Sequence, residues 1–267
     1  MKSFIASERY NIWHFSCDFY RSGEPNAVLL ISFYFLLFSL FSCSPVYYAP
    51  GPQQLPAFTK TIETRVNAGF VATHRSTGLE AFAAHTPTKH LTIAVGHASY
   101  SGNKTTPFLS TYGNGTLSEL GMGYYLWPDK RRQFVFDHCL FVAYGNFAYR
   151  SSHTQYNTEN YQLGSKFRRY SQMVGLTYKS KFFEAAISLK LAYVYYYETV
   201  QSRFCPPAYI NMLTHHPNHL MAEPSIILKA GWPNVKVYLS YEASKNLSTH
   251  EFYQQNHKVS MGVLTQF

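Results

Sequence analysis

The chain ends with HKVSMGVLTQF (residues 257–267), in which two kinds of side chain alternate. The mostly apolar set consists of Val259, Met261, Val263, Thr265 and Phe267. The set that is polar or small, apart from one leucine, consists of Lys258, Ser260, Gly262, Leu264 and Gln266. Successive side chains of an extended strand point to opposite faces. The stretch therefore predicts a β-strand with one apolar and one mostly polar face.

The same two-residue period recurs along most of the chain. Between residues 182 and 199, Phe183, Ile187 and Leu191 share one face, and Glu184 and Lys190 share the other. Segments of this kind, bounded by turn residues, predict strands. We expect them near 61–73, 77–86, 90–100, 117–127, 132–149, 165–179, 182–199, 223–232, 234–243 and 257–267. The pattern predicts an all-β fold.

The composition is unusual for a soluble enzyme. The chain has 23 Tyr and 21 Phe, and only 14% of its residues are charged, whereas about a quarter is typical of soluble domains. A wall that faces lipid and carries aromatic girdles accounts for both features. The formal charge is +9, but the basic residues are dispersed and form no recognition motif, so we expect no nucleic-acid partner. Attraction to anionic lipid headgroups explains the charge more simply.

The connections between the predicted strands alternate in length. Short turns are expected at 86–89, 128–131, 180–181 and 233. The connections between these turns are longer, at 101–116, 150–164, 200–222 and 244–256. The exception is the first connection on the long-link side, at 74–76, which is short. Bacterial outer-membrane barrels have short periplasmic turns and longer external loops. We therefore predict an antiparallel transmembrane β-barrel of about ten strands, with eight or twelve as alternatives. It would lie in the bacterial outer membrane, with both barrel termini on the periplasmic side.

Aromatic residues fall at both ends of the predicted strands, as membrane-interface girdles require. The residues assigned to the girdles are Trp127, Trp232, Tyr178, Tyr197, Tyr241 and Phe267, with Tyr100 and Tyr149 at the long-link end. Phe267 also resembles the terminal signal that the barrel assembly machinery recognises, which makes that machinery an expected partner. A soluble periplasmic lipoprotein with an apolar interior would show the same alternation; the girdles favour the membrane version.

The N-terminal part reads as a leader followed by an anchor. VLLISFYFLLFSLFS (residues 28–42) has the length of a signal-peptide hydrophobic region. The sequence Leu40-Phe41-Ser42-Cys43 resembles a bacterial lipobox, which implies lipid attachment at Cys43; an ordinary signal peptide is the alternative. We expect residues 1–42 to be a signal peptide with a misplaced start, 43–60 a lipidated tether and 61–267 the barrel. The tether, rich in Pro and Gln, would be an extended connection between lipid and barrel.

One family resemblance follows from these residues. The run YYAPGPQQLPAF (residues 47–58), followed by an alternating strand, resembles uncharacterised outer-membrane β-barrel lipoproteins of the Bacteroidota. The resemblance covers the leader, the tether and the general barrel pattern, and it implies no activity.

The polar strand faces hold the charges expected to point into the lumen. These are Glu63, Arg65, Asp137, Glu184, Lys190, Lys229 and Lys236. A barrel of about ten strands leaves little free space inside, so we expect them to pair with one another and fill the interior. A narrow solute path and a catalytic arrangement are the alternatives.

Other candidate sites are weaker. His215, His216 and His219, with Cys205 upstream, could ligate zinc or copper in the longest link, although adjacent histidines diverge in an extended chain. No nucleophile motif singles out a catalytic residue, and we expect no cofactor.

The predicted function is structural or binding: a lipid-anchored scaffold presents external loops, rich in Tyr and Asn, to an unidentified surface ligand. A narrow solute path through the barrel could accompany this role. The rivals are a barrel enzyme acting on lipid or peptide, and a soluble lipoprotein that binds an apolar ligand.

Overall fold

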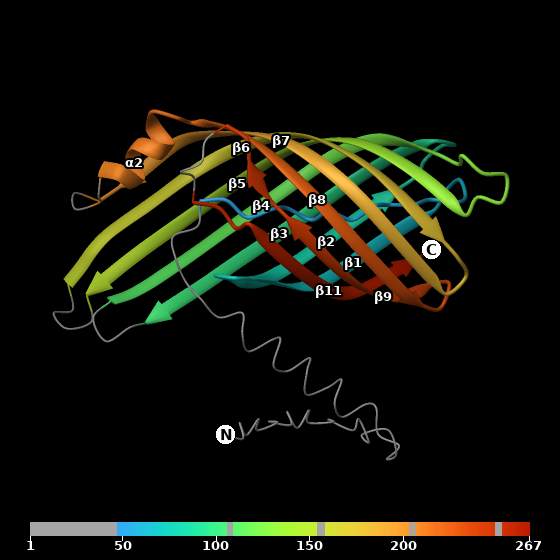
Figure 1. Cartoon of the computed structure of the whole chain (residues 1–267), viewed down its shortest axis with the longest axis horizontal. Helices are drawn as coiled ribbons and strands as arrows, with labels where there is room; N and C mark the ends of the chain where they lie inside the picture. The colour runs from blue at the N-terminus through green and yellow to red at the C-terminus, as the bar shows by residue number, and fades with distance from the viewer. Residues whose placement is uncertain (1–46, 106–108, 154–157, 203–204, 206, 249–252) are drawn as a thin grey trace, which may run out of the picture. The chain divides into compact units, whose positions relative to one another are not determined.

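The computed structural model describes residues 47–105, 109–153, 158–202, 205, 207–248 and 253–267. Ten long strands dominate it (Figure 1). They are β1 (Thr64–Thr73), β2 (Thr77–His85), β3 (Leu91–Thr105), β4 (Leu109–Leu126), β5 (Phe134–His153), β6 (Thr158–Lys179), β7 (Phe183–Gln201), β8 (Asn218–Gly231), β9 (Val235–Ala243) and β11 (His257–Gln266). A short helix, α2 (Pro207–Thr214), precedes β8, and β10 (Lys245–Asn246) pairs with β8. No helix among the described residues is long and apolar enough to cross a membrane.

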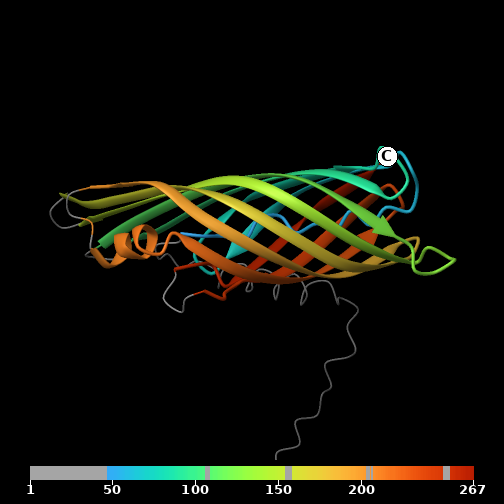
Figure 2. The ribbon, with the colours of Figure 1, turned by 90° about the horizontal axis from the view of Figure 1, so that it is seen from above.

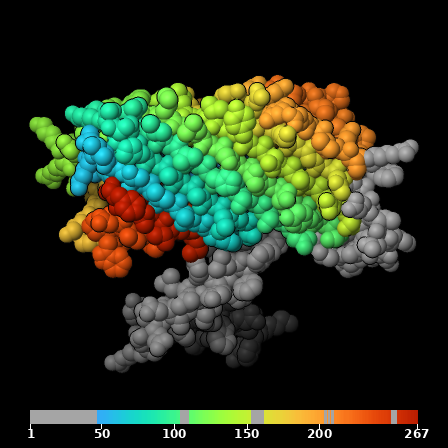
Figure 3. Space-filling view, turned by 180° about the vertical axis from the view of Figure 1, so that it is seen from behind, coloured from blue at the N-terminus to red at the C-terminus, as the bar shows by residue number. Residues whose placement is uncertain are grey.

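The ten long strands form a closed antiparallel barrel. Strands β1 to β9 pair in chain order, and β11 lies between β9 and β1. The last joint is fixed by Thr64 and Phe267, each of whose backbone N–H groups donates to the other's carbonyl, at 3.1 and 2.9 Å. Figure 2 shows the strands tilted against the barrel axis, and Figure 3 shows the red C-terminal strand beside the blue first strands. The predicted ten-strand barrel is confirmed.

The apolar face of the wall points outward. Leu79, Val237 and Met122 are each more than 60% exposed. The interior holds charged side chains such as Arg65 and Glu184, which are almost fully buried, together with clusters of buried apolar side chains. A soluble barrel would expose a polar outer wall, so the alternative of a soluble lipoprotein is wrong for this chain. The barrel is of the transmembrane type, in which closure leaves no unpaired strand edge to face lipid.

Two aromatic bands mark the height of the apolar wall. One contains Phe134, Tyr178 and Phe183, and the other contains Tyr144 and Tyr193; all five are exposed on the outer face. In β7, Phe183 belongs to the first band and Tyr193 to the second. They are ten positions apart, which is about 33 Å along the strand. At a tilt of about 40° this corresponds to roughly 25 Å along the barrel axis, the height expected of a lipid-facing band.

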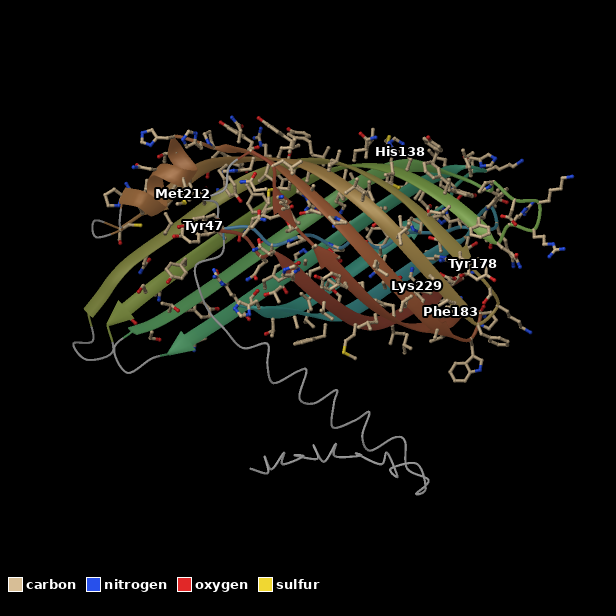
Figure 4. All side chains as sticks on the ribbon, in the orientation of Figure 1. Tyr47, His138, Tyr178, Phe183, Met212 and Lys229 are labelled. Carbon is tan, nitrogen blue, oxygen red and sulfur yellow. The ribbon has the colours of Figure 1, made fainter. Side chains whose placement is uncertain are left out.

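The two ends of the barrel differ. The end that carries Phe267 is here called the C-terminal end; its connections are the turns at 86–90, 127–133, 180–182 and 232–234. The opposite end, here called the α2 end, carries α2 and the connections that follow β1, β3, β5, β7 and β9. In Figure 4, Tyr178 and Phe183 lie at the first end, and Met212 of α2 lies at the second.

The predicted long links at 101–116 and 150–164 are mostly strand. Strands β3 and β4 pair as far as Thr105 and Ser110, and β5 and β6 as far as His153 and Thr158. Beyond the tyrosine band the outer face turns polar, with Asn103 of β3 and Arg150 of β5 exposed. Alternation of apolar and polar residues therefore stops, although the hydrogen-bond ladder continues. The wall rises above the lipid-facing band at the α2 end.

Residues 47–58, here called the lumen segment, run through the interior of the barrel (Figure 1, blue). Every residue of the segment is buried except the half-buried Ala49. This corrects the expectation of a tether outside the barrel: the segment is extended, but it packs against the lumen wall. Buried side chains such as Tyr48, Leu55 and Phe58 occupy space that the strands alone leave open.

Candidate functional site

The lumen of the barrel is lined by charges of both signs, which the strand alternation turns inward. Its buried carboxylates are Glu63, Glu80, Glu119, Asp137, Glu184, Glu223 and Glu242. Its cations are Arg65, Arg169, Lys190, Lys229, Lys236, Lys258 and the partly buried Lys179. The two sets are equal in number, so the described lumen has no net formal charge. Buried charges are tolerated when they are paired and hydrogen-bonded.

The cluster nearest the C-terminal end is built on Arg65. Its Nε is 2.9 Å from Glu63 Oε1, and its Nη1 is 3.2 Å from Glu184 Oε2. Lys236 Nζ lies 2.8 Å from Glu184 Oε1. The guanidinium also donates to Gln266 Oε1 at 2.7 Å. These contacts join β1, β7, β9 and β11 across the lumen.

A second cluster surrounds Arg169 of β6. Its Nη2 is 2.5 Å from Glu119 Oε2, and its Nη1 is 3.6 Å from Glu223 Oε2. Tyr48 of the lumen segment completes the cluster: its hydroxyl accepts from Arg169 Nη1 at 2.7 Å and donates to Glu223 Oε1 at 2.6 Å. Lys190 Nζ lies 3.4 Å from Glu119. The lumen segment is therefore part of the ion-pair network of the wall.

A third cluster is centred on Lys258 of β11. Its Nζ is 2.9 Å from Glu242 Oε2 and 3.2 Å from Glu80 Oε2. The Tyr238 hydroxyl donates to Glu80 at 3.2 Å. Lys258 also donates to the carbonyl of Gly51 at 2.8 Å. This cluster fixes the middle of the lumen segment against the strands where the barrel closes.

The backbone of the lumen segment has no partner strand along most of its length, yet many of its carbonyls accept hydrogen bonds. Three of its residues are prolines, which have no N–H to donate, so carbonyl acceptors outnumber donors. The wall supplies the donors from side chains. Besides Lys258, Lys190 Nζ donates to Pro52 O at 3.0 Å, Lys229 Nζ to Leu55 O at 3.3 Å and Trp127 Nε1 to Phe58 O at 2.9 Å.

Two glycines allow the segment and the wall to approach each other. A Cβ atom on Gly51 would lie 2.5 Å from Arg169 Nη2 and 2.7 Å from Leu117 Cδ2. A Cβ atom on Gly175, in β6, would lie 2.6 Å from Leu55 Cδ2. Distances this short exclude a side chain unless its neighbour moves. Gly175 thus leaves the space that Leu55 fills.

All seven predicted lumen residues point inward and are almost fully buried. Sequence reasoning missed an equally central set, which consists of Glu80, Glu119, Arg169, Glu223, Glu242 and Lys258. Each occupies one of the alternate strand positions that point into the lumen. The two-residue period alone could have predicted this for Glu119 and Lys258. Arg169 follows another arginine, Arg168, which is exposed, so the alternation there gives no sign of which one enters the lumen.

The three candidate metal ligands are not gathered. His219 is buried and lies 3.1 Å from Asn246 Nδ2 through its Nδ1, whereas His215 and His216 are exposed. Within the described ranges, no three His, Cys, Asp or Glu side chains form a group that could hold a metal. Cys205 is a buried free thiol, and burial raises its pKa, which disfavours the thiolate that binds metals. Cys43, the candidate lipidation residue, lies outside the described residues.

The girdle residues occupy different positions. Trp232, Tyr178, Tyr241 and Phe267 are exposed on the outer face. Tyr197 is half-buried and stacks on Tyr195, with ring centroids 6.3 Å apart.

The remaining three aromatics face inward. Trp127 is half-buried beneath Arg132, whose guanidinium lies 4.2 Å from the ring, and it covers the point where the lumen segment leaves the lumen. Tyr100 and Tyr149 are buried inside the barrel, and Trp127 packs against the interior cluster around Phe58, so assigning these three to the girdle was wrong. The two tyrosines occupy strand positions of β3 and β5 that point into the barrel. The girdle was predicted only from their position near the ends of the predicted strands.

The described residues offer little for nucleophilic catalysis. His97 Nδ1 is 2.8 Å from Ser118 Oγ, but both side chains lie on the outer wall. Apart from Asp129 in the β4–β5 turn and the exposed Glu198, the carboxylates whose side chains are described are buried in the lumen. An acid is therefore not brought to this pair.

The α2 end contains a hollow of about 570 Å³, including the part that is open to solvent. Aromatic side chains and glycines line it, among them Tyr47, Tyr100, Gly113, Gly115, Phe147 and Tyr149. A Cβ atom on Gly113 would meet nothing closer than Tyr149 Cδ2, at 3.7 Å. The start of the lumen segment forms part of its floor. This hollow combines aromatic faces with room for a small group.

No protein-family model matches the chain, and no curated protein matches its sequence. Solved structures are similar to it at low identity. The translocator domain of the autotransporter NalP from Neisseria meningitidis is 8% identical, with a TM-score of 0.44 over 76% of this chain and 87% of its own. The outer membrane protease OmpT from Escherichia coli is 10% identical, with a TM-score of 0.44 over 77% and 96%.

A third similar structure is Ail, the attachment invasion locus protein of Yersinia pestis, which is 8% identical with a TM-score of 0.37 over 78% of this chain and 100% of its own. The assignment of the fold rests on the strand pairing and on the two faces of the wall described above.

Proposed function

We propose that this protein is a bacterial outer-membrane scaffold whose lumen is sealed by its own N-terminal segment, and that it acts through the surface at its α2 end rather than as a solute channel. One observation carries the proposal: residues 47–58 occupy the lumen and are bonded to its wall from end to end. A narrow solute path along the barrel axis would have to displace this segment.

The orientation follows from the connections. The C-terminal end has only tight turns, and the α2 end carries the rising wall, α2 and the 244–256 link. Short periplasmic turns and more elaborate external connections are typical of bacterial barrels. The C-terminal end therefore faces the periplasm, and the α2 end faces outward. The start of β1 and the end of β11 both lie at the periplasmic end. Membrane lipids contact the apolar wall, and the assembly machinery inserts the barrel.

The α2 end supplies the surface for recognition. The wall above the tyrosine band is polar, and the hollow beside Tyr47 is lined by aromatic rings and glycines. Aromatic side chains provide large contact areas at a low cost in conformational entropy. A surface ligand would bind here without entering the lumen.

Ion conductance across a planar lipid bilayer tests the sealed lumen. We expect the purified full-length protein to show no conductance above background, because the segment excludes water from the axis. A variant that lacks residues 44–58 should conduct, with currents at least about tenfold above background, since charged lumen walls then hydrate. Both proteins should migrate faster on a gel when unboiled, which shows that the barrel is folded. A wild-type conductance equal to that of the folded deletion variant would contradict the proposal.

A further inference from the structure

The lumen segment has a direction, which its contacts define at both ends. At its start, Tyr47 N donates to Tyr253 O at 3.0 Å, and the Tyr196 hydroxyl donates to Tyr47 O at 3.0 Å. Tyr253 belongs to the connection after β9, and Tyr196 lies near the outer end of β7. Figure 4 shows Tyr47 and Met212 of α2 at the same end of the barrel, and Met212 packs against the buried cluster that contains Tyr47. The segment therefore begins at the α2 end.

The segment ends at the opposite side of the barrel. Trp127, which follows β4, donates to the carbonyl of Phe58, and Arg132 Nη1 donates to Thr59 O at 3.3 Å. The chain then reverses: Ala57 and Ile62 have positive φ values of 47° and 59° on either side of this exit. Strand β1 starts beside the C-terminal residue and runs back toward the α2 end. The chain thus crosses the full height of the barrel inside the lumen before its first strand begins.

Length supports a complete crossing. Eleven extended residue steps separate Tyr47 from Phe58, which corresponds to about 36 Å. The lipid-facing band is about 25 Å high. The four residue steps from Tyr47 back to Cys43 span at most about 14 Å, which is too short to return to the C-terminal end. Whatever precedes Tyr47 in the mature chain starts at the α2 end.

We propose that the lumen segment is a threaded strand that displays the mature N-terminus on the outer face of the membrane. With the cysteine lipidated, as its resemblance to a lipobox implies, the acyl chains enter the outer leaflet rather than the periplasmic leaflet. This reverses the side on which the sequence alone places the anchor. The inference rests on the orientation proposed above.

Threading also constrains assembly. Tyr48, Pro52, Gly51 and Leu55 are each bonded to or packed against a different part of the wall. A filled lumen leaves no passage for a lipidated end. The strands therefore close around a segment that is already in place.

Epitope display on intact cells tests the proposal. A short epitope is inserted between Pro45 and Val46 of the full-length protein. Two matched insertions serve as references, one between residues 155 and 156 at the α2 end and one between Asp129 and Lys130 at the C-terminal end. We expect antibody to stain the first two variants equally in intact and permeabilised cells, and to stain the 129/130 variant only after permeabilisation.

The outcomes separate this proposal from the orientation on which it rests. Staining of 155/156 but not of 45/46 in intact cells would overturn the threading and leave the orientation standing. Staining of 129/130 alone would overturn the orientation. Faster gel migration of each unboiled variant shows that it is folded. If the 45/46 insertion prevents folding, Pro45→Cys labelled with a membrane-impermeant maleimide, in a Cys139→Ala/Cys205→Ala background, gives the same readout.

Discussion

Replacing Arg169 by alanine is expected to lower the free energy of unfolding by about 3–5 kcal/mol, because it leaves Glu119 and Glu223 buried without their shared cation. Both carboxylates and the guanidinium are almost fully buried. The change also removes the donor to Tyr48, so the start of the lumen segment loses a contact at the same time. The measurement is a urea titration of the folded barrel in detergent micelles, followed by tryptophan fluorescence.

Arg168 provides a matched control because it precedes Arg169 and points outward. It lies over the Tyr197 ring, with 5.0 Å from its guanidinium carbon to the ring centroid. Cation–π contacts at exposed sites contribute about 0.5–1 kcal/mol, so Arg168→Ala should change stability by no more than that. Equal losses from the two substitutions would show that the Arg169 cluster does not stabilise the barrel.

Replacing Gly175 by phenylalanine is expected to expel the lumen segment. The Cβ atom alone would overlap Leu55, and overpacking of this kind typically costs about 1–3 kcal/mol. The barrel strands are closed by their own ladder, so we expect the segment to yield before the wall does. Limited proteolysis of the folded protein should then cleave within residues 47–58, which we expect to be protected in the wild type because they are buried.

Gly113→Phe is the matched control, since it adds the same side chain to a lumen-facing glycine that borders the hollow. Its Cβ would make only ordinary contacts, at 3.7 and 3.9 Å. We expect this variant to keep residues 47–58 protected. Cleavage of both variants at the same rate would mean that the segment is accessible in any case, and that Leu55 is not held by β6.

The sequence carried most of the information about the wall. In β7 and β9 the strict alternation gave both the strands and the faces, because each side chain meets only one of two solvents, lipid or lumen. The same parity placed Glu184 and Lys190 inside. It failed where the outer face becomes polar, as at Asn103 and Arg150 in the predicted links, because the difference between the faces disappears while backbone pairing continues.

The lumen segment could not be predicted in the same way. Its residues have no period, and its burial depends on partners far away in the chain, such as Glu223 for Tyr48, 175 residues apart. Prolines and glutamines favoured an exposed linker on local grounds. The wall contributes to this burial through lysines such as Lys190 and Lys258, which donate to carbonyls of the segment, and those contacts have no local sequence pattern.

A disulfide between the lumen segment and the wall tests the central claim most directly. The variant Leu55→Cys/Gly175→Cys, made with Cys139→Ala and Cys205→Ala, is purified from membranes without reductant, and its free thiols are counted relative to those of the Cys139→Ala/Cys205→Ala parent. The packing of Leu55 against β6 predicts that the two introduced thiols are joined in most molecules. The control Leu55→Cys/Leu176→Cys moves one cysteine to the next residue, which points outward, and should retain both thiols. Free thiols at positions 55 and 175 in a folded barrel would contradict the account, because they would place residues 47–58 outside the lumen.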